Sequence, residues 1–266
     1  MPKYKLTIEY DGTGYRGWQI QKNARSIQGT LIQAAQQLFG PDIDIQGAGR
    51  TDAGVHAMGQ VAHLDAAREI PPQKIMTGLN DLLPSNINIL SVEKVNARFH
   101  ARYHALSRTY LYLISTCRTA FGKRYVWWVR DALNIQRMQT AGRLFQGFHD
   151  FASFADRRVD KDVSSRVKMD AVDVTSRESL IILRFSASHF LWRMVRRMAG
   201  VLVEVGRGNL TPADVEKMLK EFSEVPAKWT APPSGLFLMR VLYDGDREEP
   251  VRVPFLLTPE RGGPRR

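Results

Sequence analysis

The sequence has almost no cysteine, and this absence excludes two kinds of site. Only one cysteine, Cys117, occurs in 266 residues, so no disulfide can form within the chain and no thiolate cluster can hold a metal. The histidines do not indicate a metal site either, because none of them shows the helical spacing of a known zinc site. We therefore expect no metal site.

Long apolar runs are also missing. No segment approaches the ~18 uncharged apolar residues of a membrane span, so we expect no membrane contact. Lys3, Lys5, Glu9 and Asp11 interrupt the N-terminus, where a secretory signal would need an apolar core. Hydrophobic residues still make up 44% of the chain, too many for a disordered polyelectrolyte. These features predict a cytoplasmic globular protein.

Acidic residues are scarce in defined stretches of the chain. The 38 Lys and Arg against 27 Asp and Glu give a formal charge of +11. Residues 98–130 contain seven basic residues and no acid, and residues 12–41 contain no acid either. One basic run is usually a solvated surface, but several runs with aromatic residues among them favour a nucleic-acid partner.

The apolar patterns predict an α+β protein built from two similar halves. Alternation and helical periodicity predict strands at 4–10, 43–46, 60–64, 87–95, 108–116, 167–174, 180–186 and 236–243, and helices starting near Ser26, Pro72, Ile135, Phe190 and Thr211. Each half is expected to be a mainly antiparallel sheet with helices on one face, like an RRM or ferredoxin. We place the halves at 1–104 and 105–245, followed by an extension of unknown role at 246–266.

Residues 12–17 match the GxGxxG pattern of dinucleotide-binding proteins. That fold needs a helix that opens inside the pattern, and a parallel sheet would make the preceding strand a continuous apolar run. Residues 18–24 show no amphipathic period, and the strand before the pattern alternates. We therefore expect these glycines to shape a loop that lies close to another segment, and a nucleotide-dependent oxidoreductase is the weakest alternative.

The densest functional signal is residues 47–57, GAGRTDAGVHA. Its small residues let a ligand approach the backbone, and Asp52 could reach that ligand. A tight turn in which Asp52 bonds its own backbone explains the same residues, and the segment taken alone favours the turn.

With other segments in the same order, this loop resembles the TruA family of tRNA pseudouridine synthases. GRTDAGVHA resembles the catalytic loop of that family, and the resemblance spans nearly the whole chain. The other matching segments are YDGTGYRGWQ at 10–19, ARFHARYHALSRTYLY at 97–112, GFHDFASF at 147–154, FLWRMVRRMAG at 190–200 and APPSGLFL at 231–238.

The resemblance implies an isomerase that converts uridine to pseudouridine at positions 38 to 40 of the tRNA anticodon stem-loop. The uracil is detached from N1, turned and rejoined through C5, so neither a cofactor nor a metal is needed. It also implies tRNA as the partner, a homodimer, and an active-site cleft between the two halves.

The resemblance assigns catalytic roles to Asp52, Tyr110 and Arg196. Asp52 would be the nucleophile, either attacking C1′ or assisting through a glycal-type intermediate. A bidentate contact with Arg196 would keep Asp52 ionised. Tyr110 would stack on the flipped uracil and assist proton loss at C5, although the strand pattern alone gives Tyr110 and Tyr112 a core role.

Two further residues are implied to act during base flipping. Arg50 would occupy the vacated space or hold the flipped backbone, and Leu236 would pack against the base, with an ordinary core leucine as the alternative. Flipping costs a few kcal/mol for a stacked base. A non-catalytic RNA-binding module is the competing function, and Asp52 argues against it because a carboxylate repels phosphate.

Overall fold

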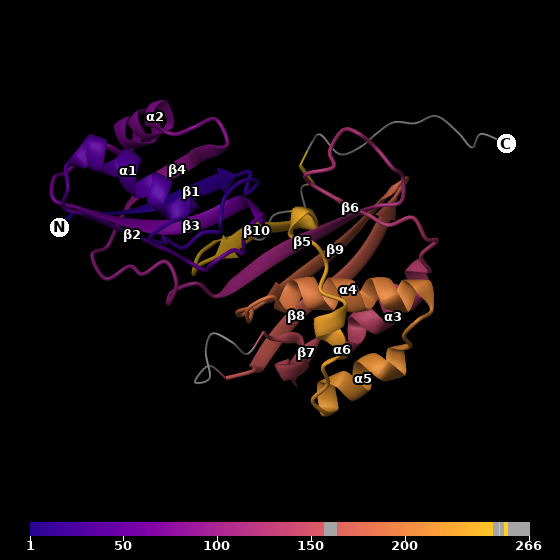
Figure 1. The fold of residues 1–266 in the computed structure, drawn as a ribbon. Coiled ribbons are helices and arrows are strands. Elements are labelled where there is room, and N and C mark those ends of the chain that lie inside the picture. The colour runs from indigo at the N-terminus through magenta and orange to yellow at the C-terminus, as the bar shows by residue number, and fades with distance from the viewer. Residues whose placement is uncertain (157–163, 247–249, 251–252, 255–266) are drawn as a thin grey trace.

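The computed structural model describes residues 1–156, 164–246, 250 and 253–254, and Figure 1 shows how their elements are arranged. The first part contains β1 (Lys3–Tyr10), α1 (Ile27–Phe39), β2 (Ile43–Gly47), β3 (His56–Ala66), α2 (Pro72–Leu82) and β4 (Ile87–Val95). The second part contains β5 (Ser107–Ser115), β6 (Trp127–Trp128), α3 (Ile135–Leu144), β7 (Gly147–Asp150), β8 (Arg166–Arg177), β9 (Leu180–Ala187), α4 (Met194–Arg207), α5 (Pro212–Lys220), α6 (Val225–Lys228) and β10 (Leu236–Leu242). The predicted α+β class is confirmed.

The strands join in one continuous sheet. Its main path is β4-β1-β3-β10-β5-β9-β8-β7, with β2 paired to β3 and β6 paired to β5. All pairs are antiparallel except β10 with β3 and β6 with β5. Strand β10 lies between β3 and β5 and so links the strands of both predicted halves, as Figure 1 shows.

Some predictions about the halves stay predictions. The likeness of each half to an RRM or ferredoxin is one, and the boundaries at residues 104 and 245 are another. The proposed extension at 246–266 lies almost entirely outside the described residues. Among the described helices, none combines the length and the apolar character required to cross a membrane.

Helices α1 and α2 cover the face of β1 that its alternation predicts. Tyr4, Leu6, Ile8 and Tyr10 are buried, and they share one apolar cluster with residues of α1 and α2. Helix α1 starts as expected, because the Ser26 side chain accepts a hydrogen bond from the Gly29 N–H at 3.1 Å.

One residue of α2 was placed wrongly by its helical period. The helical spacing of Ile75, Leu79 and Leu82 predicts that all three face the core, but Leu82 is 41% exposed whereas the other two are buried. The helix ends at this residue, and Leu83 turns inward in its place, with only 8% of its surface exposed. The period predicts a buried face only while the helical backbone continues.

Helix α4 is buried over most of its length, but it begins later than expected. The periodicity placed its start near Phe190, whereas the helix starts at Met194. Arg193 has a left-handed backbone with φ of 61°, which a right-handed helix cannot include. Residues 191–193 therefore form a turn before α4, and Trp192 lies outside the helix.

The sheet places the loop at 48–55 where the two parts of the chain meet. Strand β2 pairs with the later residues of β3, from Ala62 to Ala66, and β10 pairs with its first residues, His56 and Ala57. The loop that connects β2 to β3 therefore lies beside the point where β10 joins the sheet. Tyr110 of β5 is paired with Leu238 of β10, on the next strand.

Candidate active site

A cleft of about 1380 Å³ opens at this junction. The five residues that the resemblance singled out all line it, namely Arg50, Asp52, Tyr110, Arg196 and Leu236. They come from the β2–β3 loop, β5, α4 and β10, which are far apart in the sequence. The fold therefore brings the predicted site residues together in one place.

Both carboxylate oxygens of Asp52 accept a hydrogen bond. Arg196 Nη1 donates to Oδ2 at 3.2 Å, and Trp192 Nε1 donates to Oδ1 at 2.9 Å. The Asp52 side chain is 21% exposed and that of Arg196 is 14% exposed, so the pair is largely shielded from water but still open to the cleft. The ion pair expected between Arg196 and Asp52 is present.

The expected bidentate contact is absent from this pair. Arg196 Nε donates to the Ala231 carbonyl oxygen at 2.7 Å, so one edge of the guanidinium is committed to the backbone. The second donor to Asp52 is Trp192, which the sequence alone did not indicate. A signal was available, since Trp192 belongs to the matching segment at 190–200.

The loop after β1 supports the loop that carries Asp52. Trp18 N–H donates to the Thr51 carbonyl oxygen at 3.0 Å, and the hydroxyls of Tyr10 and Thr51 share a hydrogen bond of 2.8 Å. A Cβ atom on Gly12 would lie 2.0 Å from the Val55 carbonyl oxygen. The expectation that these glycines lie close to another segment is therefore confirmed for Gly12 and Gly17, but not for Gly14, where an added Cβ atom would have nothing within 4 Å.

Tyr110 presents a buried ring and a neutral hydroxyl at the cleft. It is 9% exposed, and its ring meets that of Phe190 edge to face, with centroids 5.0 Å apart. Burial, with Tyr10 and Asp52 nearby, raises the pKa of Tyr110 above its ordinary value, so the hydroxyl stays protonated at neutral pH. Tyr112 has the expected core role, and its hydroxyl donates to the Pro232 carbonyl oxygen at 2.7 Å.

Arg50 and Leu236 occupy different parts of the cleft. Arg50 is exposed at its edge, where Nε donates to Gln19 Oε1 at 3.1 Å. Leu236 is only 5% exposed and is the first residue of β10. Arg50 is therefore accessible to a large ligand, whereas Leu236 forms an apolar part of the wall.

Arg108 connects the segments that carry the site. Its Nη2 donates to the carbonyl oxygens of Ala48 and Arg102 at 3.1 and 2.8 Å. Its Nη1 donates to those of Ala105 and Ser188 at 3.1 and 2.7 Å. Ala48 opens the loop of Asp52, and Ser188 precedes the turn of Trp192. Because carbonyls do not neutralise a guanidinium, Arg108 also leaves positive charge in the cleft.

Arginines outnumber acids along the cleft wall. The arginines are Arg16, Arg50, Arg102, Arg108, Arg193 and Arg196, and the acids are Asp44, Asp52 and Asp156. Arginine binds phosphate oxygens through paired N–H groups. This wall agrees with the polyanionic partner that the uneven charge of the sequence predicts.

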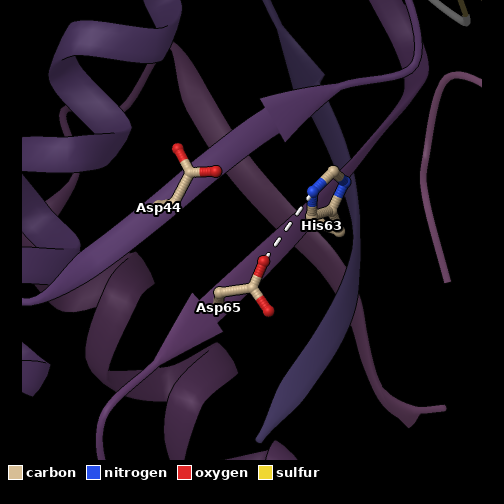
Figure 2. Close-up of side chains that lie close together, drawn as sticks. All are labelled: Asp44, His63 and Asp65. Atoms are coloured by element: carbon tan, nitrogen blue, oxygen red, sulfur yellow. Dashed lines mark ion pairs between the residues drawn. The ribbon is translucent and has the colours of Figure 1, made fainter. Parts of the chain in front are cut away.

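Asp44, His63 and Asp65 come close enough to suggest a metal site (Figure 2), with possible ligand atoms within 4.8 Å of one another. His63 Nδ1 accepts the Ala101 N–H at 3.2 Å, which leaves the proton of a neutral imidazole on Nε2, 3.8 Å from Asp65 Oδ2. That nitrogen then has no lone pair for a metal. Lys3 Nζ already lies 3.2 Å from the same Asp65 oxygen, so the contacts described here are those of a Lys3–Asp65 ion pair beside a neutral imidazole.

Comparisons with known proteins point to one family. A family model described as tRNA pseudouridine synthase matches residues 6–104 and 141–244. The tRNA pseudouridine synthase A of Allorhizobium ampelinum is 43% identical, over 92% of this chain and 96% of the relative. That of Agrobacterium fabrum is 41% identical, over 91% of this chain and 93% of the relative.

A solved structure is more distant. The crystal structure of a Cbf5-Nop10-Gar1 complex matches at 11% identity with a TM-score of 0.34, over 75% of this chain and 45% of that chain, and it carries no weight here. The family match and the two relatives each cover most of this chain. The chain therefore belongs to the family of tRNA pseudouridine synthases, which are isomerases.

Proposed function

We propose that this chain isomerises uridine to pseudouridine at positions 38 to 40 of the tRNA anticodon stem-loop, with Asp52 as the nucleophile. The observation that carries the proposal is the Asp52 carboxylate, which Arg196 and Trp192 hold inside a cleft rich in arginine. A surface that only binds RNA gains nothing from a carboxylate there, because it repels phosphate. An enzyme that acts on the sugar or the base needs one.

The reaction balances without a further reactant. The bond between N1 and C1′ breaks, a bond between C5 and C1′ forms, C5 loses a proton and N1 gains one. An ionised Asp52 either adds to C1′ or assists through a glycal-type intermediate, and in both routes the carboxylate keeps its ion pair with Arg196. Uridine and pseudouridine are isomers, so no cofactor or metal takes part in this proposal.

Tyr110, Leu236 and Arg50 complete the proposed site. The flipped uracil packs between the Tyr110 ring and Leu236, which line the same cleft. The Tyr110 hydroxyl is protonated, so it can accept the C5 proton only while it passes its own proton on. Arg50 at the edge enters the vacated stack or holds the flipped phosphate backbone, which offsets part of the few kcal/mol that flipping costs.

The proposal extends to the assembly and the organisation of the chain. It includes a homodimer in which both subunits contact one tRNA, halves at 1–104 and 105–245, and a cytoplasmic location. Sedimentation of the protein with and without tRNA tests the proposed homodimer. A particle of two chains is expected, and a single chain at every concentration would contradict it.

Site mapping in designed tRNAs tests the activity itself. Transcripts carry a single uridine at position 38, 39 or 40, with cytidine at the other two, and a control transcript carries no uridine at any of them. Mass spectrometry should find pseudouridine at each of the three positions and none in the control. Binding without pseudouridine would support the RNA-binding module, and pseudouridine elsewhere in the tRNA would exclude the anticodon stem-loop as the target.

A further inference from the structure

Trp192 contacts the proposed nucleophile although no motif assigns it a role. Its Nε1 lies 2.9 Å from Asp52 Oδ1, the shorter of the two hydrogen bonds described for that carboxylate. An indole N–H is a donor only and does not titrate in the working range of pH. Trp192 therefore acts on Asp52 in one way at all working pH values, by donating to one oxygen.

Arg196 cannot fix the orientation of the carboxylate alone. Its Nε is committed to Ala231, and only Nη1 reaches Asp52, at Oδ2. A carboxylate held at one oxygen can still turn about its Cβ–Cγ bond, because that terminal torsion is soft. A second donor at Oδ1 removes this freedom and defines the plane of the carboxylate.

The backbone around Trp192 is held firmly enough to aim the indole. Its carbonyl oxygen accepts the Asp156 N–H at 3.0 Å, and the Arg193 guanidinium lies 4.8 Å from the centroid of its ring. The left-handed conformation of Arg193 separates Trp192 from α4. Such a backbone is strained in a residue other than glycine, so the surrounding contacts must maintain this turn.

We propose that Trp192 is a positioning residue that sets the plane of the Asp52 carboxylate through its indole N–H. The proposal rests on the proposed function, in which Asp52 acts on the sugar. It goes further by naming the group that aims the nucleophile. Arg196 supplies the charge and one contact, and Trp192 supplies the second contact and the orientation.

Two substitutions separate the hydrogen bond from the bulk of the ring. Trp192→Phe keeps an aromatic ring and removes the donor. Trp192→His restores a donor at the same place, because Nε2 of imidazole and Nε1 of indole occupy the same position relative to Cγ. Trp128→Phe is the matched control, since Trp128 is 42% exposed and does not line the cleft.

Single-turnover rates and tRNA affinities give the first readout. Trp192→Phe should lower the rate of pseudouridine formation about 10- to 100-fold, the usual effect of one hydrogen bond to a charged group, while the Kd for tRNA changes less than about twofold. Trp192→His should recover most of the rate at about pH 8, where imidazole is neutral.

Three results would overturn the proposal. They are a Trp192→Phe rate equal to that of the Trp128→Phe control, a Trp192→His rate as low as that of Trp192→Phe, and a loss that appears only in the Kd for tRNA. The last two would give Trp192 a packing or RNA-binding role.

A second readout needs no substrate. Carbon-13 NMR of labelled aspartate, recorded at one fixed pH and assigned with Asp52→Asn, reports on the hydrogen bonds that the Asp52 carboxylate accepts. The signal of Asp52 should move in Trp192→Phe and stay in place in Trp128→Phe. An unchanged signal in Trp192→Phe would contradict the contact even in an active enzyme. A moved signal in a protein that makes no pseudouridine would refute the proposed function and leave the contact standing.

Discussion

Gly17 lies directly against Thr51, so that a Cβ atom added to Gly17 would stand 2.5 Å from the Thr51 carbonyl oxygen. Gly17 also has a φ of 92°, a conformation that other residues adopt at a cost. Thr51 is the neighbour of Asp52, so the glycine loop determines how closely the backbone of the proposed nucleophile is supported. The GxGxxG pattern in this chain therefore reflects contact between two loops.

Gly17→Ala should damage both stability and activity. The left-handed backbone costs about 1 kcal/mol for alanine, and the overlap with Thr51 adds about 1–3 kcal/mol or displaces the loop. Gly14→Ala is the matched control, because Gly14 also has a positive φ of 82° but has nothing within 4 Å of the added Cβ. Thermal melting and pseudouridine assays should show a larger loss in Gly17→Ala, and equal losses would contradict this account of the loop.

Arg196→Lys should impair turnover although the charge is kept. Arg196 reaches Ala231 and Asp52 with two different nitrogens, and one ammonium group cannot reproduce that geometry. We expect the single-turnover rate to fall about 10- to 100-fold with little change in tRNA affinity. Arg207→Lys, in the last turn of the same helix, serves as control. A normal rate in Arg196→Lys would show that charge alone suffices at this position.

Arg108→Gln should loosen the junction between the two parts of the chain. The substitution removes donors from carbonyl oxygens of the Asp52 loop and of the segment before α4, at about 1–3 kcal/mol of unfolding free energy. Denaturant unfolding measures this loss. Arg98→Gln, at an exposed position of the same basic stretch, should change stability by less than about 0.5 kcal/mol. If the two variants are equally stable, Arg108 is not a tie between the segments.

His56 should make the protein less stable in mild acid. Burial lowers the pKa of His56 below its ordinary 6.5, although Asp11 lies nearby and opposes the shift. Below pH 6.5 the unfolded chain binds a proton at this residue and the folded chain does not, so stability falls as pH falls. The melting temperature should therefore decrease from about pH 7.5 to about pH 5.5, and less steeply in His56→Gln. His63, His100 and His189 have lowered pKa values as well, so some dependence should remain. A slope as steep in His56→Gln as in the wild type would contradict this assignment.

The local elements follow from the sequence because their signals are local. Alternation from Tyr4 to Tyr10 identifies β1 and its buried face, and Ser26 marks the start of α1. The place of β10 does not follow in the same way. Alternation predicts that residues 236–243 form a strand, but its neighbours depend on contacts between distant segments. Its position between β3 and β5, which joins the sheet, needed the structure.

The sequence predicted only part of the candidate site, and the reason why a residue was identified or missed differs from one residue to the next. The residues around Asp52 alone favoured a turn, and only the resemblance pointed to Asp52, Tyr110 and Arg196. Trp192 was missed because a tryptophan in an apolar helix pattern is usually core. The direction of its N–H depends on the left-handed turn at Arg193, which the pattern does not indicate. The sequence indicates Arg108 only as part of a basic stretch. Its role as a tie between segments could not be predicted, because its carbonyl partners include residues 60 and 80 positions away.

Replacement of the Asp52 carboxylate by an amide tests the central claim most directly. Asp52→Asn keeps the size of the side chain and removes the charge. Because slow deamidation of asparagine can regenerate aspartate, Asp52→Ala is tested beside it as a variant that cannot recover the carboxylate. Each variant is incubated with tRNA bearing uridines at positions 38 to 40, with pseudouridine measured by mass spectrometry and the Kd for tRNA measured in parallel. Neither variant should form pseudouridine while both still bind tRNA. Pseudouridine formed by both at a rate within about tenfold of the wild type would contradict the assignment of Asp52 as the nucleophile.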